Sequence, residues 1–399
     1  MQKKLLTLAV AGALAAPGIA LAQVEVYGTI NMSFGNVKYD SVGATPSVSK
    51  WDVANHASNY GIRGRESLGA GLTAWFQLEQ NAPLERSNNA AITPASRNSA
   101  VGLQGAWGNL FMGQWTTPWA DLDALWGIGT VGGWGPVTSI IGRRETTGTA
   151  PNPNCGPNVH GLATACDAVE AGGGVGHALW RRASNAVFYQ SPVFGGFQGK
   201  IAYQTNEGKA TTGTVVDASL WSGSVQWAGM GGRLRVGAAY DIHQDFSFIG
   251  KDDKGWRVTG GWNFGFADIG LAYETFEYGF TATADCEAEQ YGIAVAVPVG
   301  PGAIRASYAE AQELEGPGCA AIVGNPGNGG GGSAKTYNIG YEHRFSKRTS
   351  VGVGYATIEN EGTAAFAWTG LPPNQGGAAN GPLPGGTVKT FFVNTIHRF

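Results

Sequence analysis

The last stretch of the chain constrains its fold more than any other feature. Residues 387–399 read TVKTFFVNTIHRF, a run rich in strand-forming residues that ends on Phe399 without a turn or a polar tail. Every second position from Phe391 to Phe399 is mostly apolar, so one face of the predicted strand ends in an aromatic ring. In a membrane barrel the last strand must pair with the first, and aromatic rings gather at the membrane interface. The run therefore predicts the closing strand of a transmembrane β-barrel, with Phe399 as an assembly signal.

The first 22 residues have the pattern of an export signal. Two lysines precede an apolar run at residues 5–16, and residues 20–22 read Ala-Leu-Ala, a small-x-small cleavage site. A membrane anchor is the weaker interpretation, because the apolar run is short and a Pro-Gly pair interrupts it. We therefore expect a cleaved signal peptide at residues 1–22 and a single barrel domain at residues 23–399.

The balance of charge argues against one class of partner. Lys and Arg number 26 and Asp and Glu 29, a formal net charge of −3, and removing the two lysines of the leader leaves 24 against 29, or −5. Chains that bind nucleic acid are usually basic, so we expect no nucleic-acid partner. No stretch after the leader reaches the roughly 18 consecutive apolar residues of a membrane helix. We therefore expect the exported chain in the periplasm, outside the cell or in the outer membrane.

Composition and periodicity favour strands over helices. The sequence holds 64 Gly but only four Met, and residues 72–79 alternate four apolar residues with Thr, Trp, Gln and Glu. From residue 23 onward we count sixteen strand-like segments, joined in turn by short turns and by long loops. The first loop covers residues 36–55 and the longest covers residues 115–180. This pattern predicts an all-β fold, a 16-stranded antiparallel transmembrane β-barrel with short periplasmic turns and long extracellular loops.

Five segments carry the motifs of one known family. They read VEVYGTINMSF, SNYGIRGRESLGAGLTAWFQLE, RNSAVGLQGAWGNLFMGQWTTPW, RRASNAVFYQSPVFGGFQGKIAYQ and FFVNTIHRF. They resemble the trimeric general porins of Gram-negative outer membranes, in their β-proteobacterial form. The resemblance implies a homotrimer of outer-membrane barrels, each with a water-filled pore for passive diffusion of ions and small hydrophilic solutes. It also implies contact with outer-membrane lipid and lipopolysaccharide and with the outer-membrane assembly machinery.

The resemblance further implies where the pore is narrowed. In the family, loop 3 folds inward, and acids on this loop face a basic ladder on the opposite wall. Asp121 and Asp123 match the loop acids, whereas Arg63 matches a basic position of the second strand, with Arg65 on the same face. Arg182 matches the opening of the sixth strand. Opposite charges across a wet constriction orient dipolar solutes and bias ions. The alternative is that these side chains are ordinary solvated charges of a polar lumen.

Two departures from the family bear on ion preference. Gln114 stands where the fifth strand usually ends in arginine, and Asn59 stands where an arginine is common. Because two expected cations are missing, strong anion selectivity does not follow from the resemblance.

Loop 3 is rich in tryptophan, and its rings allow two interpretations. Trp115, Trp119, Trp126 and Trp134 fall within a short stretch. Their indole faces would form a stacking pathway in a substrate-selective channel, or they would fasten a long loop to the barrel wall. We favour the second interpretation. A third possibility, from another class, is a surface adhesion or binding barrel whose long loops matter more than its pore.

The four cysteines suggest disulfides, because export exposes the chain to an oxidising compartment. Four cysteines allow three connectivities. Cys155 and Cys166 both fall inside loop 3, and Cys286 and Cys319 fall at the outer ends of consecutive strands, so these two pairs are the candidates.

Nothing in the sequence indicates catalysis. The six histidines are scattered without metal or catalytic spacing, and no Cys-x-x-Cys is present. We therefore expect no enzymatic activity, no metal site and no cofactor.

Overall fold

The computed structural model describes residues 23–85, 94–141, 179–205, 218–246, 250–279, 281–321, 331–368, 371 and 382–399. The predicted signal peptide and the candidate Cys155–Cys166 bridge lie outside these residues. Within them, the helices are short turns of chain, and none has the length and hydropathy needed to span a bilayer.

The described residues form one sheet of 17 strands. The strands are β1 (Gln23–Tyr39), β2 (Val48–Asn55), β3 (Asn59–Gly69), β4 (Leu72–Asn81), β5 (Ser99–Gly105), β6 (Gly108–Thr116), β7 (Arg182–Gln190), β8 (Phe197–Gln204), β9 (Ser219–Gly229), β10 (Leu234–Gln244), β11 (Asp252–Asn263), β12 (Asp268–Tyr278), β13 (Cys286–Val299), β14 (Gly302–Ala311), β15 (Ala334–Arg344), β16 (Thr349–Asn360) and β17 (Thr387–Arg398). The helical turns are α2 (Pro118–Asp121), α3 (Asp123–Trp126), η1 (Pro136–Thr138), η2 (Met230–Gly232) and η3 (Pro317–Ala321).

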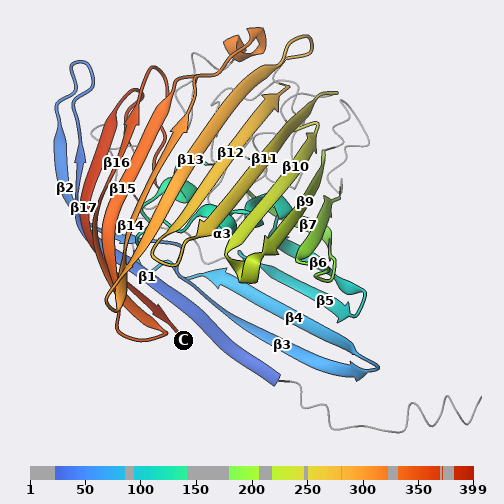
Figure 1. Ribbon diagram of the computed structural model, residues 1–399. Coiled ribbons are helices and arrows are strands. Elements are labelled where there is room, and N and C mark those ends of the chain that lie inside the picture. Colours follow the sequence, from blue (N-terminus) through green and yellow to red (C-terminus); the bar gives the residue numbers. More distant parts are fainter. Residues whose placement is uncertain are drawn as a thin grey trace, which may run out of the picture.

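The sheet closes on itself as an antiparallel barrel (Figure 1). Successive strands pair with one another, and β17 returns to pair with β1. Along the other edge of β1, β2 pairs with residues 32–39 and β3 with residues 23–29. Since β2 and β3 follow each other along one edge, the 17 strands occupy sixteen positions around the barrel. The predicted 16-stranded antiparallel fold is therefore confirmed.

Side chains alternate between an apolar outer face and a more buried inner face. On β17, Phe391 is 70% exposed, whereas its neighbour Phe392 is 4% exposed. Val393 is again exposed, and Asn394 is buried. Large apolar side chains that face outward on many strands suit a hydrocarbon environment, because a barrel in a membrane gives every second residue to lipid.

The predicted first loop at residues 36–55 is wrong for most of its length. β1 continues to Tyr39 and β2 begins at Val48, and these two residues pair across the hairpin. Val37 and Tyr39 are almost fully buried in the main apolar cluster. Burial of these side chains and the ladder hydrogen bonds extend the strands beyond the point where charged residues interrupt the apolar pattern.

Short turns join β3 to β4, β5 to β6 and later pairs of strands, as the predicted alternation of short turns and long loops requires. The turn between β3 and β4 needs left-handed backbone at three successive residues, with φ of 83° at Gly69, 50° at Ala70 and 78° at Gly71. Glycine adopts such angles without steric cost, which explains the glycines at two of the three positions of this tight turn.

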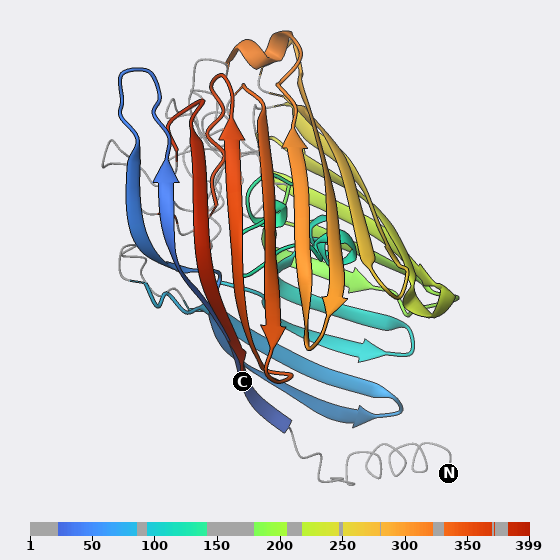
Figure 2. The ribbon, with the colours of Figure 1, turned by 60° about the vertical axis from the view of Figure 1, so that its left-hand side comes forward.

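The chain that leaves β6 packs on the inner, buried side of the strands (Figure 2). Pro118 starts α2 after the N-cap Thr117, whose hydroxyl accepts a hydrogen bond from the Ala120 N–H. Helix α2 contacts β9 and β10, and α3 contacts β11 and β12. Beyond α3, Asn338 of β15 donates a hydrogen bond to the Gly129 carbonyl at 2.9 Å. This segment therefore runs along the inner wall from β9 towards β15.

Candidate functional site

Asp121 of α2 forms an ion pair with a cation of the barrel wall. The Lys200 Nζ of β8 lies 2.9 Å from the Asp121 Oδ2. Burial raises the pKa of the Asp121 carboxyl above its usual range, although Lys200 opposes this shift and the nearby Asp123 adds to it. The acid therefore faces the adjacent wall and is charge-compensated there.

Asp123 is held by a buried arginine. The Nη2 of Arg257, on β11, contacts the Asp123 Oδ1, and its Nη1 donates to the Trp119 carbonyl at 3.2 Å. Its Nε lies 3.5 Å from the Oε2 of Glu274, on β12. The indole of Trp180 donates to the other Asp123 oxygen at 2.6 Å. A fully buried arginine needs such partners, because an unpaired buried charge is costly.

Neither wall partner was predicted. Lys200 and Arg257 each occupy an inward-facing position of their strand. Because side chains alternate between the two faces of a strand, the sequence alone places these charges on the inner wall. Their pairing with Asp121 and Asp123 depends on where the segment after β6 lies, which no local pattern encodes. An inward-facing basic residue on a strand is the signal that was available.

The expected basic residues occupy other surroundings. Arg63, half exposed, pairs with Glu25 of β1 at 2.8 Å, and its guanidinium lies 4.7 Å from the Tyr27 ring centroid. Arg182, at the start of β7, is largely buried and donates to the Asn98 Oδ1 at 2.9 Å. These arginines therefore do not pair with the two acids of the loop.

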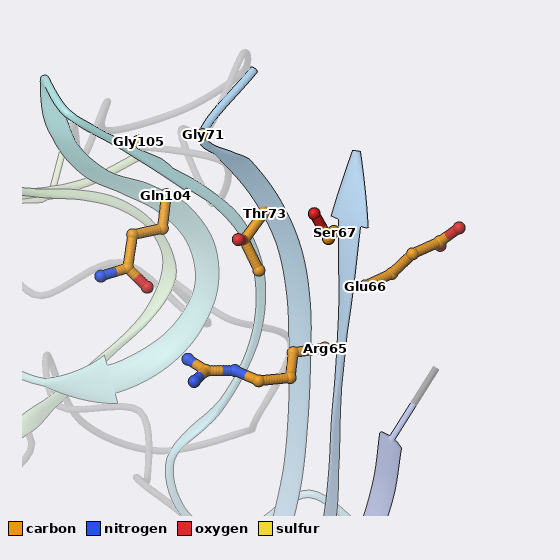
Figure 3. A pocket seen from close by; sticks show the side chains of 7 residues that line it. All are labelled: Arg65, Glu66, Ser67, Gly71, Thr73, Gln104 and Gly105. Carbon is orange, nitrogen blue, oxygen red and sulfur yellow. The ribbon is translucent and has the colours of Figure 1, made fainter. Parts of the chain in front are cut away.

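Arg65 reaches into a pocket at the short-turn end of β3, β4 and β5. Figure 3 shows its guanidinium pointing towards the Gln104 side chain, with Thr73 beside it and Glu66 directed away. Within the described part of the chain, Arg65 has no ion pair and no side-chain hydrogen bond. It is therefore a cation of the inner wall without a counter-ion there.

Three of the four loop tryptophans are buried. Trp119, Trp126 and Trp134 are 0%, 0% and 1% exposed. Trp134, for example, lies edge-on to His56 at 4.6 Å between ring centroids, and its indole N–H donates to the Ser33 hydroxyl at 3.2 Å. Such rings attach the segment to the wall and present no face to a passing solute.

Trp115 differs from the other three tryptophans. It is partly exposed on β6, within an inner-wall group of rings that includes Trp75 and Phe111. The sequence placed it with the loop, whereas the strand continues through it to Thr116.

Two other predicted features are present in the described residues. Cys286 and Cys319 form a disulfide that ties the start of β13 to η3. Phe399 exchanges two backbone hydrogen bonds with Gly28 of β1, at 3.2 and 3.1 Å. The last residue of the chain therefore takes part in closing the barrel.

Comparison with known proteins points to one family. The family described as Gram-negative porin matches residues 7–363. Outer membrane porin protein 32 of Delftia acidovorans is 25% identical over 370 residues, 90% of each chain. An anion-selective porin from Comamonas acidovorans has a TM-score of 0.70 at 22% identity, covering 95% of this chain and 100% of that one. The trimer form of OmpT from Vibrio cholerae has a TM-score of 0.60 at 15% identity, covering 95% and 99%. Both structures show a likeness of fold.

Proposed function

The chain belongs to the Gram-negative porin family, and we propose that it forms a water-filled channel for passive diffusion of ions and small hydrophilic solutes. It is a protein of the outer membrane. The observation that carries the proposal is the closed barrel, whose outer face is apolar and whose inner face carries charges such as Arg63, Arg65 and Lys200. Diffusion through such a pore needs no cofactor and no catalytic group, so we expect no enzymatic activity.

The segment after β6 would narrow this pore. It lies against the inner sides of β9 to β12, held by the Asp121–Lys200 and Asp123–Arg257 pairs and by buried tryptophans. Since both acids are compensated locally, we infer that their main role is to hold the segment in place. A neutral pair produces a weaker field in the lumen than a single charge does.

Charge preference would then depend on cations without partners. Arg65 has no counter-ion in the described residues, whereas Arg63 is paired with Glu25. At about 0.15 M salt the field of an exposed charge extends over roughly 8 Å before it is largely screened. We therefore propose a weak preference for anions.

We also propose that three copies assemble. The structural likeness to a trimeric porin supports a homotrimer, and the apolar outer face requires lipid or a neighbouring barrel. Lipopolysaccharide and the outer-membrane assembly machinery are the further partners that this location implies.

A planar bilayer tests the proposal. Purified, unheated protein in a KCl gradient should insert with conductance steps in groups of three. The reversal potential should be small, and its sign should indicate a preference for chloride over potassium. Heat-denatured protein is the control and should give no steps. Absence of conductance from protein that still migrates as a heat-modifiable barrel would contradict an open channel. A surface-binding barrel would then be the better interpretation.

A further inference from the structure

The inner wall of β4 to β6 carries an indole ring fixed in one orientation. Trp75 lies over Gly102 of β5, where a Cβ atom would come within 2.7 Å of the indole nitrogen. The same N–H donates to the Asn109 Oδ1 at 2.8 Å. The neighbouring rings of Phe111 and Trp115 stand at 57° and 72° to it. The indole therefore lies against a glycine, and the rings beside it are inclined to its plane instead of stacked on it.

This ring adjoins the pocket of Arg65. Trp75 and Arg65 are paired across β4 and β3. Thr73 lies two residues from Trp75 on the same face of β4, about 7 Å along the strand, and it lines the pocket with Gln104 (Figure 3). A flat aromatic surface and a cation with polar neighbours thus lie side by side on the wall.

The chemistry of these groups selects a class of solute. A guanidinium without a counter-ion binds carboxylates through charge-assisted hydrogen bonds, to which a hydroxyl and an amide can add. Trp75 is partly exposed, and a partly exposed indole favours aromatic rings over aliphatic chains. A small molecule that carries both a carboxylate and a ring satisfies both groups at this spacing.

We propose that Arg65, Thr73, Gln104 and Trp75 form a subsite for aromatic monocarboxylates at the short-turn mouth of the pore. The proposal rests on the proposed channel function and names a solute class that the channel would favour. The subsite is separate from the segment after β6, because none of its residues belongs to that segment.

Block of the KCl current by added solute tests the subsite. Phenylacetate should block wild-type channels at about tenfold lower concentration than acetate, which lacks the ring, or benzyl alcohol, which lacks the charge. Arg65→Gln should abolish the advantage of phenylacetate over benzyl alcohol. Trp75→Leu should abolish its advantage over acetate, and Trp75→Phe should retain part of that advantage. Arg233→Gln removes a cation next to another short turn and should behave as wild type.

The possible failures can be told apart. Equal block by all three solutes in conducting wild-type channels would overturn the proposed subsite and leave the proposed channel function intact. Unchanged phenylacetate block in Arg65→Gln overturns it as well. If wild-type protein gives no KCl conductance, the channel proposal fails, and calorimetric titration of detergent-solubilised protein then decides the subsite. In that titration phenylacetate should bind more tightly than acetate. Equal binding of the two solutes overturns the subsite proposal.

Discussion

Individual charges on the inner wall are mostly compensated by a specific partner. Arg63 pairs with Glu25, Lys200 with Asp121, and Arg257 with Asp123. Each pair joins residues from different elements, so each one holds the barrel or its inner segment together as well as adjusting the field in the lumen. Removing one partner therefore changes both charge and structure, and only matched variants separate these effects.

The Arg63–Glu25 pair gives such a matched test. Arg63→Ala leaves the Glu25 carboxylate uncompensated in the lumen and should shift the reversal potential towards cations. The double variant Arg63→Gln with Glu25→Gln is neutral overall and should stay close to wild type. Because the pair is half exposed, we expect a stability change of no more than about 1 kcal/mol. An unchanged reversal potential in Arg63→Ala would remove this residue from the conduction path.

The segment after β6 is the element that we propose to narrow the pore. It carries two short helical turns, too short to hold their shape alone, so its place depends on contacts with the wall. The Arg257 guanidinium contacts this segment twice, at the Asp123 carboxylate and at the Trp119 carbonyl.

Arg257→Met should loosen this segment. The substitution keeps much of the side-chain volume but leaves Asp123 and Glu274 without this cation, at a cost of about 3–5 kcal/mol for a buried pair. We expect noisier single-channel current and heat-modifiability at a lower temperature. Arg257→Lys keeps the charge and should be milder. Current noise equal to wild type in Arg257→Met would show that other contacts are enough to hold the segment.

Asp121 makes the charge of this segment sensitive to pH. Its pKa is raised, so on acidification it takes up a proton at a higher pH than an ordinary aspartate does. The carboxyl then becomes neutral while Lys200 stays positive, and the reversal potential should move towards anions as the pH falls from 7 to 4. An acid with a raised pKa in the folded state also destabilises that state as pH rises through the interval between its unfolded and folded values.

The Asp121→Asn variant is the control for this titration. It should show the anion-shifted potential at pH 7 and little further change on acidification. If wild type and Asp121→Asn follow the same curve, another group is responsible for the pH dependence.

Closure of the whole barrel depends on the meeting of the two ends of the sheet. Residues 29–39 of β1 pair with β17, and the Phe399 backbone forms hydrogen bonds with Gly28. A Cβ atom at Gly28 would lie 2.5 Å from the Phe399 ring and 2.7 Å from the Asn59 carbonyl oxygen of β3. Gly28 therefore lets three strands approach closely at this point.

Gly28→Val should impair closure, because its side chain overlaps the backbone of β3 as well as a ring. We expect a smaller heat-modifiable fraction after refolding into detergent and less folded protein in the outer membrane. Ile30→Val, two residues along on the same face of β1, is the matched control and should refold normally. Normal refolding of Gly28→Val would show that the Phe399 ring and the β3 edge can move aside.

The architecture followed from patterns that are local in the chain. Alternation with a period of two, as in residues 72–79, places one face towards lipid, and glycine-rich turns set the strand ends. An even count of such strands, joined in turn by short turns and long loops, predicts a closed barrel. The error at residues 36–55 arose because charged residues hide the pattern there, while burial of Val37 and Tyr39 extends the hairpin.

The site depends on contacts that are distant in the chain. The alternation of side chains along the strand placed Arg63 and Arg65 on the inner face. It did not show that Glu25 compensates Arg63, nor that Arg65 has no such partner in the described residues. Likewise, Asp123 and Arg257 are 134 residues apart in sequence and meet only because the segment after β6 packs on the inner wall. Periodicity is a property of neighbouring residues, whereas ion pairing depends on register and packing across the barrel. The chain's own pattern was therefore sufficient for the barrel, and three-dimensional packing selected the partners of its charges.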